Sequence, residues 1–183
     1  MNYNKLLNFF DMLIIVALCT TLLIAFSYQF TVNDLPCAMC VMSRMGVYAM
    51  SFGLLANLLL SRNTKNYLLV IIAGLIQMAI SLEFIVRHIV PGSGSYGSPV
   101  FGLHMYSWNF IFTVLIIIYC CIAGLISNNI SNNQNKPTLI LKLIIALLFL
   151  TLFANTISTF VECGIYSCPS DPHSYWLLDL LHR

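Results

Sequence analysis

Two pairs of closely spaced cysteines are the residues of this chain best suited to chemistry. Cys37 and Cys40 lie two residues apart in a C-x-x-C pattern, and Cys163 and Cys168 form a second short-range pair. Thiols at such spacings can form a disulfide that exchanges with other thiols, or they can bind a metal. Each pair also lies beside a long apolar segment. The arrangement predicts a protein that passes electrons between soluble thiols and an acceptor dissolved in lipid.

Cys37 follows Pro36 at the expected start of an apolar helix. Proline suits the first turn of a helix, because its missing N–H would have no partner there. The free amides and the dipole of a helix N-terminus lower the pKa of a nearby thiol and favour the nucleophilic thiolate. Cys40 lies on the adjoining turn, where the two sulfurs can form an exchangeable disulfide. The sequence therefore predicts a reactive dithiol at Cys37 and Cys40.

Arg44 lies four residues after Cys40 and hence on the same helical face. An arginine within a membrane span is costly and is a functional candidate for that reason. It could stabilise the Cys40 thiolate or an anionic, partly reduced electron carrier. The alternative is an arginine that extends to the phosphates of the membrane surface.

Cys163 and Cys168 enclose a short loop with Gly164 at its start and Pro169 just beyond it. Glycine and proline favour a turn, so the loop can close as a disulfide. A bridge across so small a loop removes little chain entropy and stabilises a fold weakly. An exchangeable disulfide is therefore the preferred interpretation, with a purely structural bridge as the alternative. The sequence does not show which of the two cysteines is attacked first.

Glu83, Arg87 and His88 close the third apolar segment. Glu83 and Arg87 could form an ion pair, and His88 could donate a hydrogen bond to a quinone oxygen or relay protons. They could equally be ordinary charges at the membrane surface.

Free cysteines inside apolar spans behave as small apolar residues, and no redox role is expected for three of them. These are Cys19, Cys120 and Cys121.

The composition is that of a membrane protein. Of the 183 residues, 60% are hydrophobic and only 8% are charged, against about 25% charged residues in ordinary soluble domains. A soluble fold of this length could not bury so much apolar surface, so the chain is expected to form a single integral membrane domain. The net charge of +2 is small and scattered, which argues against a nucleic-acid partner.

Charged residues divide the chain into five apolar intervals, each of roughly the 17–25 residues that a membrane-spanning helix needs. Helices are required there because the bilayer offers no partners for free backbone groups. The predicted fold is an all-α bundle of about five transmembrane helices, near 11–31, 38–60, 67–88, 105–126 and 139–160. No small-x-small cleavage site follows the first segment, so it is expected to be a retained helix and not a signal peptide.

The basic residues indicate the orientation, because cytoplasmic loops carry an excess of lysine and arginine. With a cytoplasmic N-terminus, the inner side carries Lys5, Arg62, Lys65, Lys136 and Lys142. Both cysteine pairs then face the outer, oxidising side, where disulfides persist. The tail, 161–183, is expected on that side as well. Four of its apolar residues share a helical face that can lie on the membrane surface, although a frayed end is the alternative. They are Trp176, Leu177, Leu180 and Leu181.

Several of these motifs resemble one protein family. Pro36-Cys37-Ala38-Met39-Cys40, followed by Ser43-Arg44, resembles the first active site of the DsbB family of disulfide-generating membrane oxidoreductases. The stretches 96–108 and 162–169 resemble segments of one branch of that family. The resemblance implies an enzyme of the bacterial inner membrane that uses ubiquinone or menaquinone. It also implies a periplasmic thioredoxin-fold partner of the DsbA type, which the enzyme reoxidises in support of protein folding.

The resemblance also implies roles for individual residues. Cys37 and Cys40 match the quinone-coupled pair, and Arg44 matches the arginine of the quinone site. His88 and, less closely, Arg87 match residues near the quinone at the end of the third helix. The best-known members carry their second cysteine pair between the third and fourth helices, whereas Cys163 and Cys168 follow a fifth span here. This second pair would exchange with the partner.

Three other functions are compatible with the cysteine pattern. A protein like vitamin K epoxide reductase would use nearly the same chemistry with different natural thiols. Four outer cysteines could instead hold zinc, which binds four thiolates well, although an oxidising compartment disfavours that and no metal is expected. The last alternative is a structural membrane protein with incidental disulfides.

Overall fold

The computed structural model describes residues 3–31, 35–60, 62–89, 99–127, 138–164, 168 and 175–177. Over these residues it contains five helices, each long and apolar enough to cross a membrane. They are α1 (Tyr3–Thr31), α2 (Ala38–Leu59), α3 (Thr64–His88), α4 (Met105–Ser127) and α5 (Leu139–Cys163). The prediction of an all-α, multi-pass membrane protein is confirmed. The first helix begins eight residues earlier than expected (3 against 11), because Lys5 and Asp11 continue the helix instead of marking its edge.

Local side-chain bonds mark where two of the helices, α3 and α5, begin. Asn63 accepts a hydrogen bond from the backbone N–H of Lys65 (3.1 Å) at the start of α3, and Thr138 accepts one from Leu141 (3.3 Å) at the start of α5. Such caps satisfy amides that have no partner within the helix. Gly164 ends α5 with a φ of 64°, a conformation that favours glycine.

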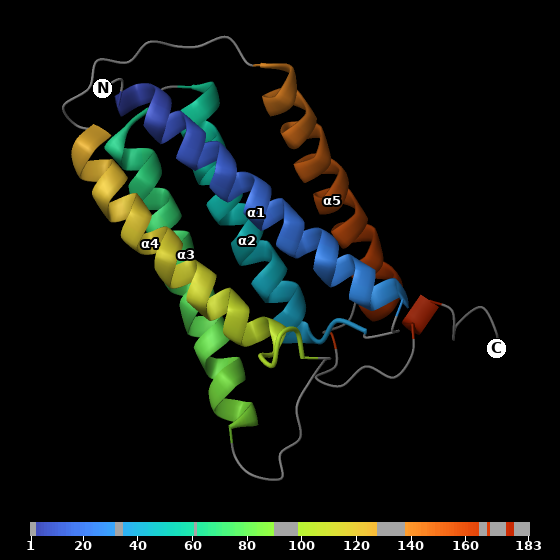
Figure 1. Cartoon of the computed structure of the whole chain (residues 1–183). Coiled ribbons are helices and arrows are strands. Elements are labelled where there is room, and N and C mark those ends of the chain that lie inside the picture. The colour runs from blue at the N-terminus through green and yellow to red at the C-terminus, as the bar shows by residue number, and fades with distance from the viewer. Residues whose placement is uncertain are drawn as a thin grey trace.

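The helices form one bundle in which α3 packs against both α2 and α4 (Figure 1). On the other side of α2 lies α1, and α5 joins the bundle mainly through α1. Successive helices run in opposite directions (Figure 1). The ends of α1, α3 and α5 therefore meet the beginnings of α2 and α4, and both cysteine pairs lie at this end of the bundle.

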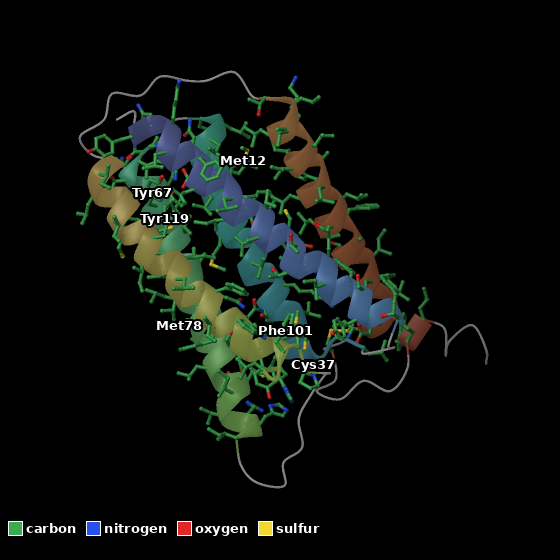
Figure 2. All side chains as sticks on the ribbon, in the orientation of Figure 1. Met12, Cys37, Tyr67, Met78, Phe101 and Tyr119 are labelled. Carbon is green, nitrogen blue, oxygen red and sulfur yellow. A yellow bond between two sulfur atoms is a disulfide. The ribbon has the colours of Figure 1, made fainter. Side chains whose placement is uncertain are left out.

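A buried polar cluster holds the opposite end together. Asp11 of α1 is fully buried and forms an ion pair with Arg62 (3.0 Å). Its carboxylate also accepts hydrogen bonds from the hydroxyls of Tyr67 (2.9 Å) and Tyr119 (2.7 Å), which belong to α3 and α4. Figure 2 shows both tyrosines far from Cys37. The cluster thus joins α1, α3, α4 and the α2–α3 connection through a single carboxylate.

We expect the substitution Asp11→Ala to destabilise the protein strongly. It leaves the Arg62 guanidinium buried without its anion, which costs about 3–5 kcal/mol. The control is Glu83→Ala, because Glu83 forms an exposed ion pair with Arg87 that is worth about 0–1 kcal/mol. Unfolding of the detergent-solubilised protein, followed by fluorescence, measures both losses. Equal losses in the two variants would contradict the role of the buried cluster.

Candidate active site

Cys37 and Cys40 form a close dithiol at the start of α2. Cys37 is the cap residue of this helix, and its sulfur accepts a hydrogen bond from the backbone N–H of Cys40 (3.2 Å). The two sulfurs lie 2.7 Å apart and share a hydrogen bond, without a disulfide between them. Cys37 is 3% exposed, while Cys40 is partly exposed. The pair is therefore positioned to form a disulfide with little movement.

The surroundings of Cys37 favour its thiolate. The hydrogen bond with the Cys40 thiol lowers the pKa of Cys37, and backbone N–H groups at the start of α2 lower it further, whereas burial opposes them. This agrees in direction with the effect predicted for a thiol at a helix N-terminus. Of the two thiols, Cys37 is therefore the one whose thiolate form is favoured.

A cavity of about 130 Å³ lies beside this dithiol. It is lined by α1–α4 and by the segment that leads into α2. Cys40 and Arg44 face it, whereas Cys37 is absent from its wall, so that Cys40 is the thiol available to a ligand there. The remaining wall residues are mostly apolar. They include Ala25, Tyr28, Leu35, Pro36, Met39, Ile80, Phe84, Met105 and Tyr106.

Arg44 is held inside the bundle by uncharged groups from neighbouring helices. One guanidinium nitrogen donates to the side-chain oxygens of Gln29 (3.0 Å) and Asn155 (3.3 Å). The other reaches the carbonyl oxygen of Ala25 (3.5 Å), and the guanidinium carbon lies 4.8 Å from the centre of the Phe26 ring. Arg44 is therefore buried and does not extend to the membrane surface. Its positive charge remains available to the cavity.

A second group of polar side chains lies at the cavity, with Ser43 and Asn109 in its wall. The Ser43 hydroxyl oxygen accepts hydrogen bonds from the amides of Gln77 (2.7 Å) and Asn109 (2.8 Å). Gly46 makes room for Gln77, since a Cβ at this glycine would lie 2.1 Å from the amide oxygen. With both acceptor positions used, the Ser43 hydrogen is free to point toward a ligand. Gln77 and Asn109 were not predicted from the sequence, although polar residues within apolar spans are themselves a signal.

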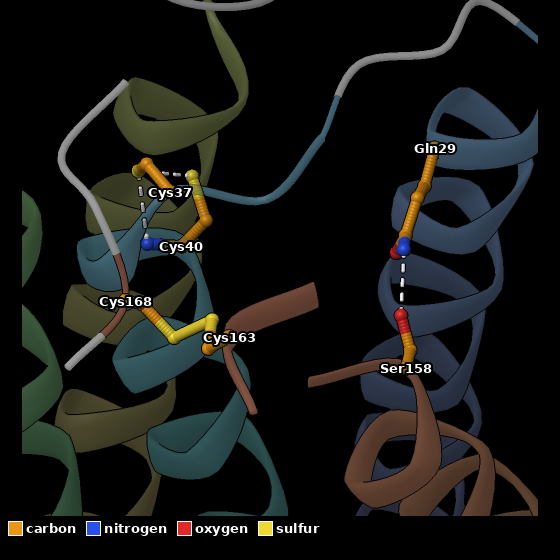
Figure 3. The surroundings of a disulfide bond; sticks show 6 residues. All are labelled: Gln29, Cys37, Cys40, Ser158, Cys163 and Cys168. Atoms are coloured by element: carbon orange, nitrogen blue, oxygen red, sulfur yellow. Dashed lines mark hydrogen bonds between the residues drawn. A yellow bond between two sulfur atoms is a disulfide. The ribbon is translucent and has the colours of Figure 1, made fainter. Parts of the chain in front are cut away.

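Cys163 and Cys168 form a disulfide at the end of α5 (Figure 3). Their Cα atoms are 4.9 Å apart, within the range that a disulfide spans without moving the backbone. The neighbouring Gly164 lies against the Trp176 ring, which leaves no space for a Cβ. Of the predicted surface helix, Trp176 and Leu177 are helical, whereas Leu180 and Leu181 lie outside the described residues.

Polar contacts bring α5 to the dithiol end of the bundle. Asn155 binds Arg44 of α2, and Ser158 accepts a hydrogen bond from the Gln29 amide of α1 (2.6 Å; Figure 3). The same close-up contains both cysteine pairs. Arg44 and Gln29 therefore connect α5, the helix that carries Cys163, to the cavity whose wall includes Cys40.

The charged residues at the end of α3 lie outside the wall of the cavity. Arg87 forms an exposed ion pair with Glu83. The His88 ring stacks on Phe84 and Tyr106, with ring centres 4.8 Å and 5.7 Å apart, and both of these residues line the cavity. His88 thus packs against two residues of the cavity wall from outside the cavity. Quinone contact by His88 and Arg87 stays a prediction.

The other cysteines lie away from both pairs in the bundle. Cys19 and Cys120 are buried, and Cys121 is exposed on α4. Over the ranges that the structure describes, no group of three or more histidine, cysteine or acidic side chains gathers in an arrangement that could bind a metal ion.

The fold and the site together define a multi-pass membrane protein with a buried dithiol and a neighbouring disulfide. Residues 8–91 match the family model described as Disulfide bond formation protein DsbB. The matched segment is slightly less than half of the chain, and it supports a DsbB-like disulfide bond formation protein, a kind of protein with a thiol oxidoreductase role in the membrane. The matched segment contains Cys37, Cys40 and Arg44, whereas Cys163 and Cys168 lie beyond it. No curated protein and no solved structure matches the chain.

We expect Cys37 of the reduced protein to react with iodoacetamide at lower pH than an ordinary cysteine does. Because its pKa is lowered mainly by the Cys40 thiol, the substitution Cys40→Ala should move the midpoint of the pH–rate profile upward. Mass spectrometry of the Cys37 peptide measures the rate at each pH. Cys19→Ala is the control and should leave the midpoint in place. An unchanged midpoint in Cys40→Ala would show that the contact between the two thiols has no influence on reactivity.

Proposed function

We propose that this protein reoxidises a periplasmic thioredoxin-fold protein of the DsbA type and passes the electrons to a membrane quinone. The reduced partner transfers its electrons to the Cys163–Cys168 disulfide by exchange through a mixed disulfide. The resulting thiols then reduce the Cys37–Cys40 disulfide. The bacterial inner membrane is the expected location, with both pairs on the periplasmic side. The observation that supports this best is that Cys40 and the buried Arg44 share one small cavity.

The residues of this cavity fit the head group of a quinone. Its volume of about 130 Å³ is close to that of protein cavities known to take a benzene ring. Its wall is mostly apolar, and Arg44, Ser43 and Asn109 offer hydrogen-bond donors to carbonyl oxygens on a ring. Ubiquinone and menaquinone both present such a ring. When bound, the quinone supplies the acceptor for two electrons and two protons.

The protein's own residues divide the chemistry at this site between them. Cys37 is shielded and held close to Cys40, so that the disulfide between them can form with little rearrangement. Closing that disulfide releases the two electrons and two thiol protons on the side that faces the cavity. Arg44 stabilises negative charge on the Cys40 sulfur or on a ligand oxygen, since its other contacts are with neutral groups.

We expect Cys37→Ser and Cys40→Ser each to abolish quinone reduction by a reduced thioredoxin-fold substrate, because either change prevents the disulfide from forming. Quinone absorbance, measured with the protein in membranes, follows the reaction. Cys121→Ser is the matched control and should retain full turnover, since Cys121 is exposed on α4. Undiminished turnover in either active-pair variant would exclude the relay.

We expect Arg44→Ala to raise the apparent KM for quinone by about 10–100-fold, which corresponds to the loss of a charged hydrogen bond worth about 1.5–3 kcal/mol. The cysteines should remain oxidisable by an added chemical oxidant. Asn155→Ala removes one partner of the guanidinium but keeps its charge, so the KM should change less. If the KM is the same in Arg44→Ala and in the parent protein, Arg44 has a structural role alone.

A further inference from the structure

Glu162 is a buried carboxyl group next to Cys163 of the disulfide in the sequence. It precedes Cys163 near the end of α5 and is 3% exposed. Among the residues that the structure describes, neither of its carboxyl oxygens has a hydrogen-bond partner. Of the charged side chains that the structure describes, Arg44 is the one that acts on it electrostatically. The hydrogen bonds of Arg44 nonetheless go to neutral oxygens, so the two groups form no ion pair.

This environment keeps the proton on Glu162 while the disulfide is intact. A carboxylate removed from water without hydrogen bonds is strongly disfavoured, whereas the neutral acid is tolerated. A neutral acid also explains why Arg44 bonds to Gln29 and Asn155 instead of pairing with Glu162. The disulfide therefore has a protonated carboxyl group next to it in the sequence and within the same buried end of α5.

The two sulfurs of this disulfide differ in their access to the outside. Cys163 is 5% exposed, whereas Cys168 is partly exposed. An incoming thiolate attacks one sulfur and expels the other. An attacker from solution can reach Cys168 more easily, which makes Cys163 the leaving group. The thiolate expelled at Cys163 is then buried, where a bare negative charge is costly.

We propose that Glu162 is the proton donor for the opening of the Cys163–Cys168 disulfide, with Cys168 as the attacked sulfur. This inference deepens the proposed function and rests on it. The attacking thiolate forms a bond to the Cys168 sulfur as the disulfide breaks. The electron pair of that bond goes to the Cys163 sulfur, which takes the proton from Glu162. The Glu162 carboxylate that results is stabilised by the nearby positive charge of Arg44 and regains its proton from water.

The attacked sulfur can be identified with glutathione as a monothiol probe. The full-length protein carries Cys37→Ser and Cys40→Ser, so that the second pair reacts alone. It is exposed to glutathione, and the liberated thiol is blocked at once with iodoacetamide. Peptide mapping should find glutathione on Cys168 and the alkyl group on Cys163. The reverse distribution, or an equal mixture, would overturn the assignment.

The role of Glu162 is tested by the rate of this opening in Glu162→Gln, which keeps the shape of the side chain without its transferable proton. We expect a rate about 100-fold lower per attacking thiolate, the low end of what a positioned acid contributes. Glu162→Asp retains a proton and should recover at least part of the loss. A rate in Glu162→Gln equal to that of the parent would overturn the proposal.

The pH profile separates proton donation from a structural effect. The parent rate, corrected for the fraction of glutathione thiolate, should fall as rising pH removes the proton from Glu162, and Glu162→Gln should show no such decline. The same dependence on pH in both proteins would also overturn the proposal. Thermal unfolding should be unchanged in Glu162→Gln, because a neutral amide replaces a neutral acid. A marked loss of stability would instead indicate a charged Glu162 paired with Arg44.

Glu83→Gln is the matched control, since Glu83 is an exposed carboxylate on α3 that pairs with Arg87. Its rate of opening should equal that of the parent. These measurements use neither quinone nor a protein partner. A normal rate of disulfide opening in Glu162→Gln would therefore refute the role of Glu162 as proton donor and leave the relay intact. Failure of the relay would appear only in the quinone turnover of the Cys37 and Cys40 variants.

Discussion

The burial of the Arg44 guanidinium is the constraint on which the active end of the bundle depends. A cation removed from water must find hydrogen-bond acceptors, and here they come from Gln29 and Ala25 of α1 and from Asn155 of α5. Satisfying one side chain of α2 thus fixes the positions of two other helices. The same side chain faces the cavity beside Cys40, so the bonds that hold the helices together also orient the charge at the site.

The two cysteine pairs occupy environments suited to different tasks. Cys37 and Cys40 lie close together at the start of α2, and Cys40 faces a small, largely apolar cavity inside the bundle. Cys163 and Cys168 are oxidised, and their disulfide is partly accessible through Cys168. An internal dithiol beside an apolar cavity suits a lipid-soluble acceptor, while an accessible disulfide suits a soluble thiol donor. In the proposed relay, electrons enter at the accessible disulfide and leave from the internal dithiol.

Polar residues within apolar helices serve two separate purposes in this protein. At one end, Asp11 is satisfied by Arg62, Tyr67 and Tyr119, and the resulting network is complete around the carboxylate. At the other end, Arg44 and the Glu162 carboxyl group form no ion pair, and the carboxyl oxygens of Glu162 have no hydrogen-bond partner among the described residues. A complete network stabilises helix packing, whereas incompletely satisfied groups are available for reaction.

The sequence by itself determined the class of fold, since five long apolar intervals with so few charges can only be membrane helices. It also singled out the two cysteine pairs and Arg44 as candidates, because short cysteine spacings and an arginine within a span are local features. Three other features were decided by the tertiary structure alone. They are the partners of Arg44, the hydrogen bonds that join Ser43 to Gln77 and Asn109, and the position of α5 beside the dithiol. These features depend on which faces of distant helices meet, and helices that are apolar on nearly every side carry too little periodicity to specify that.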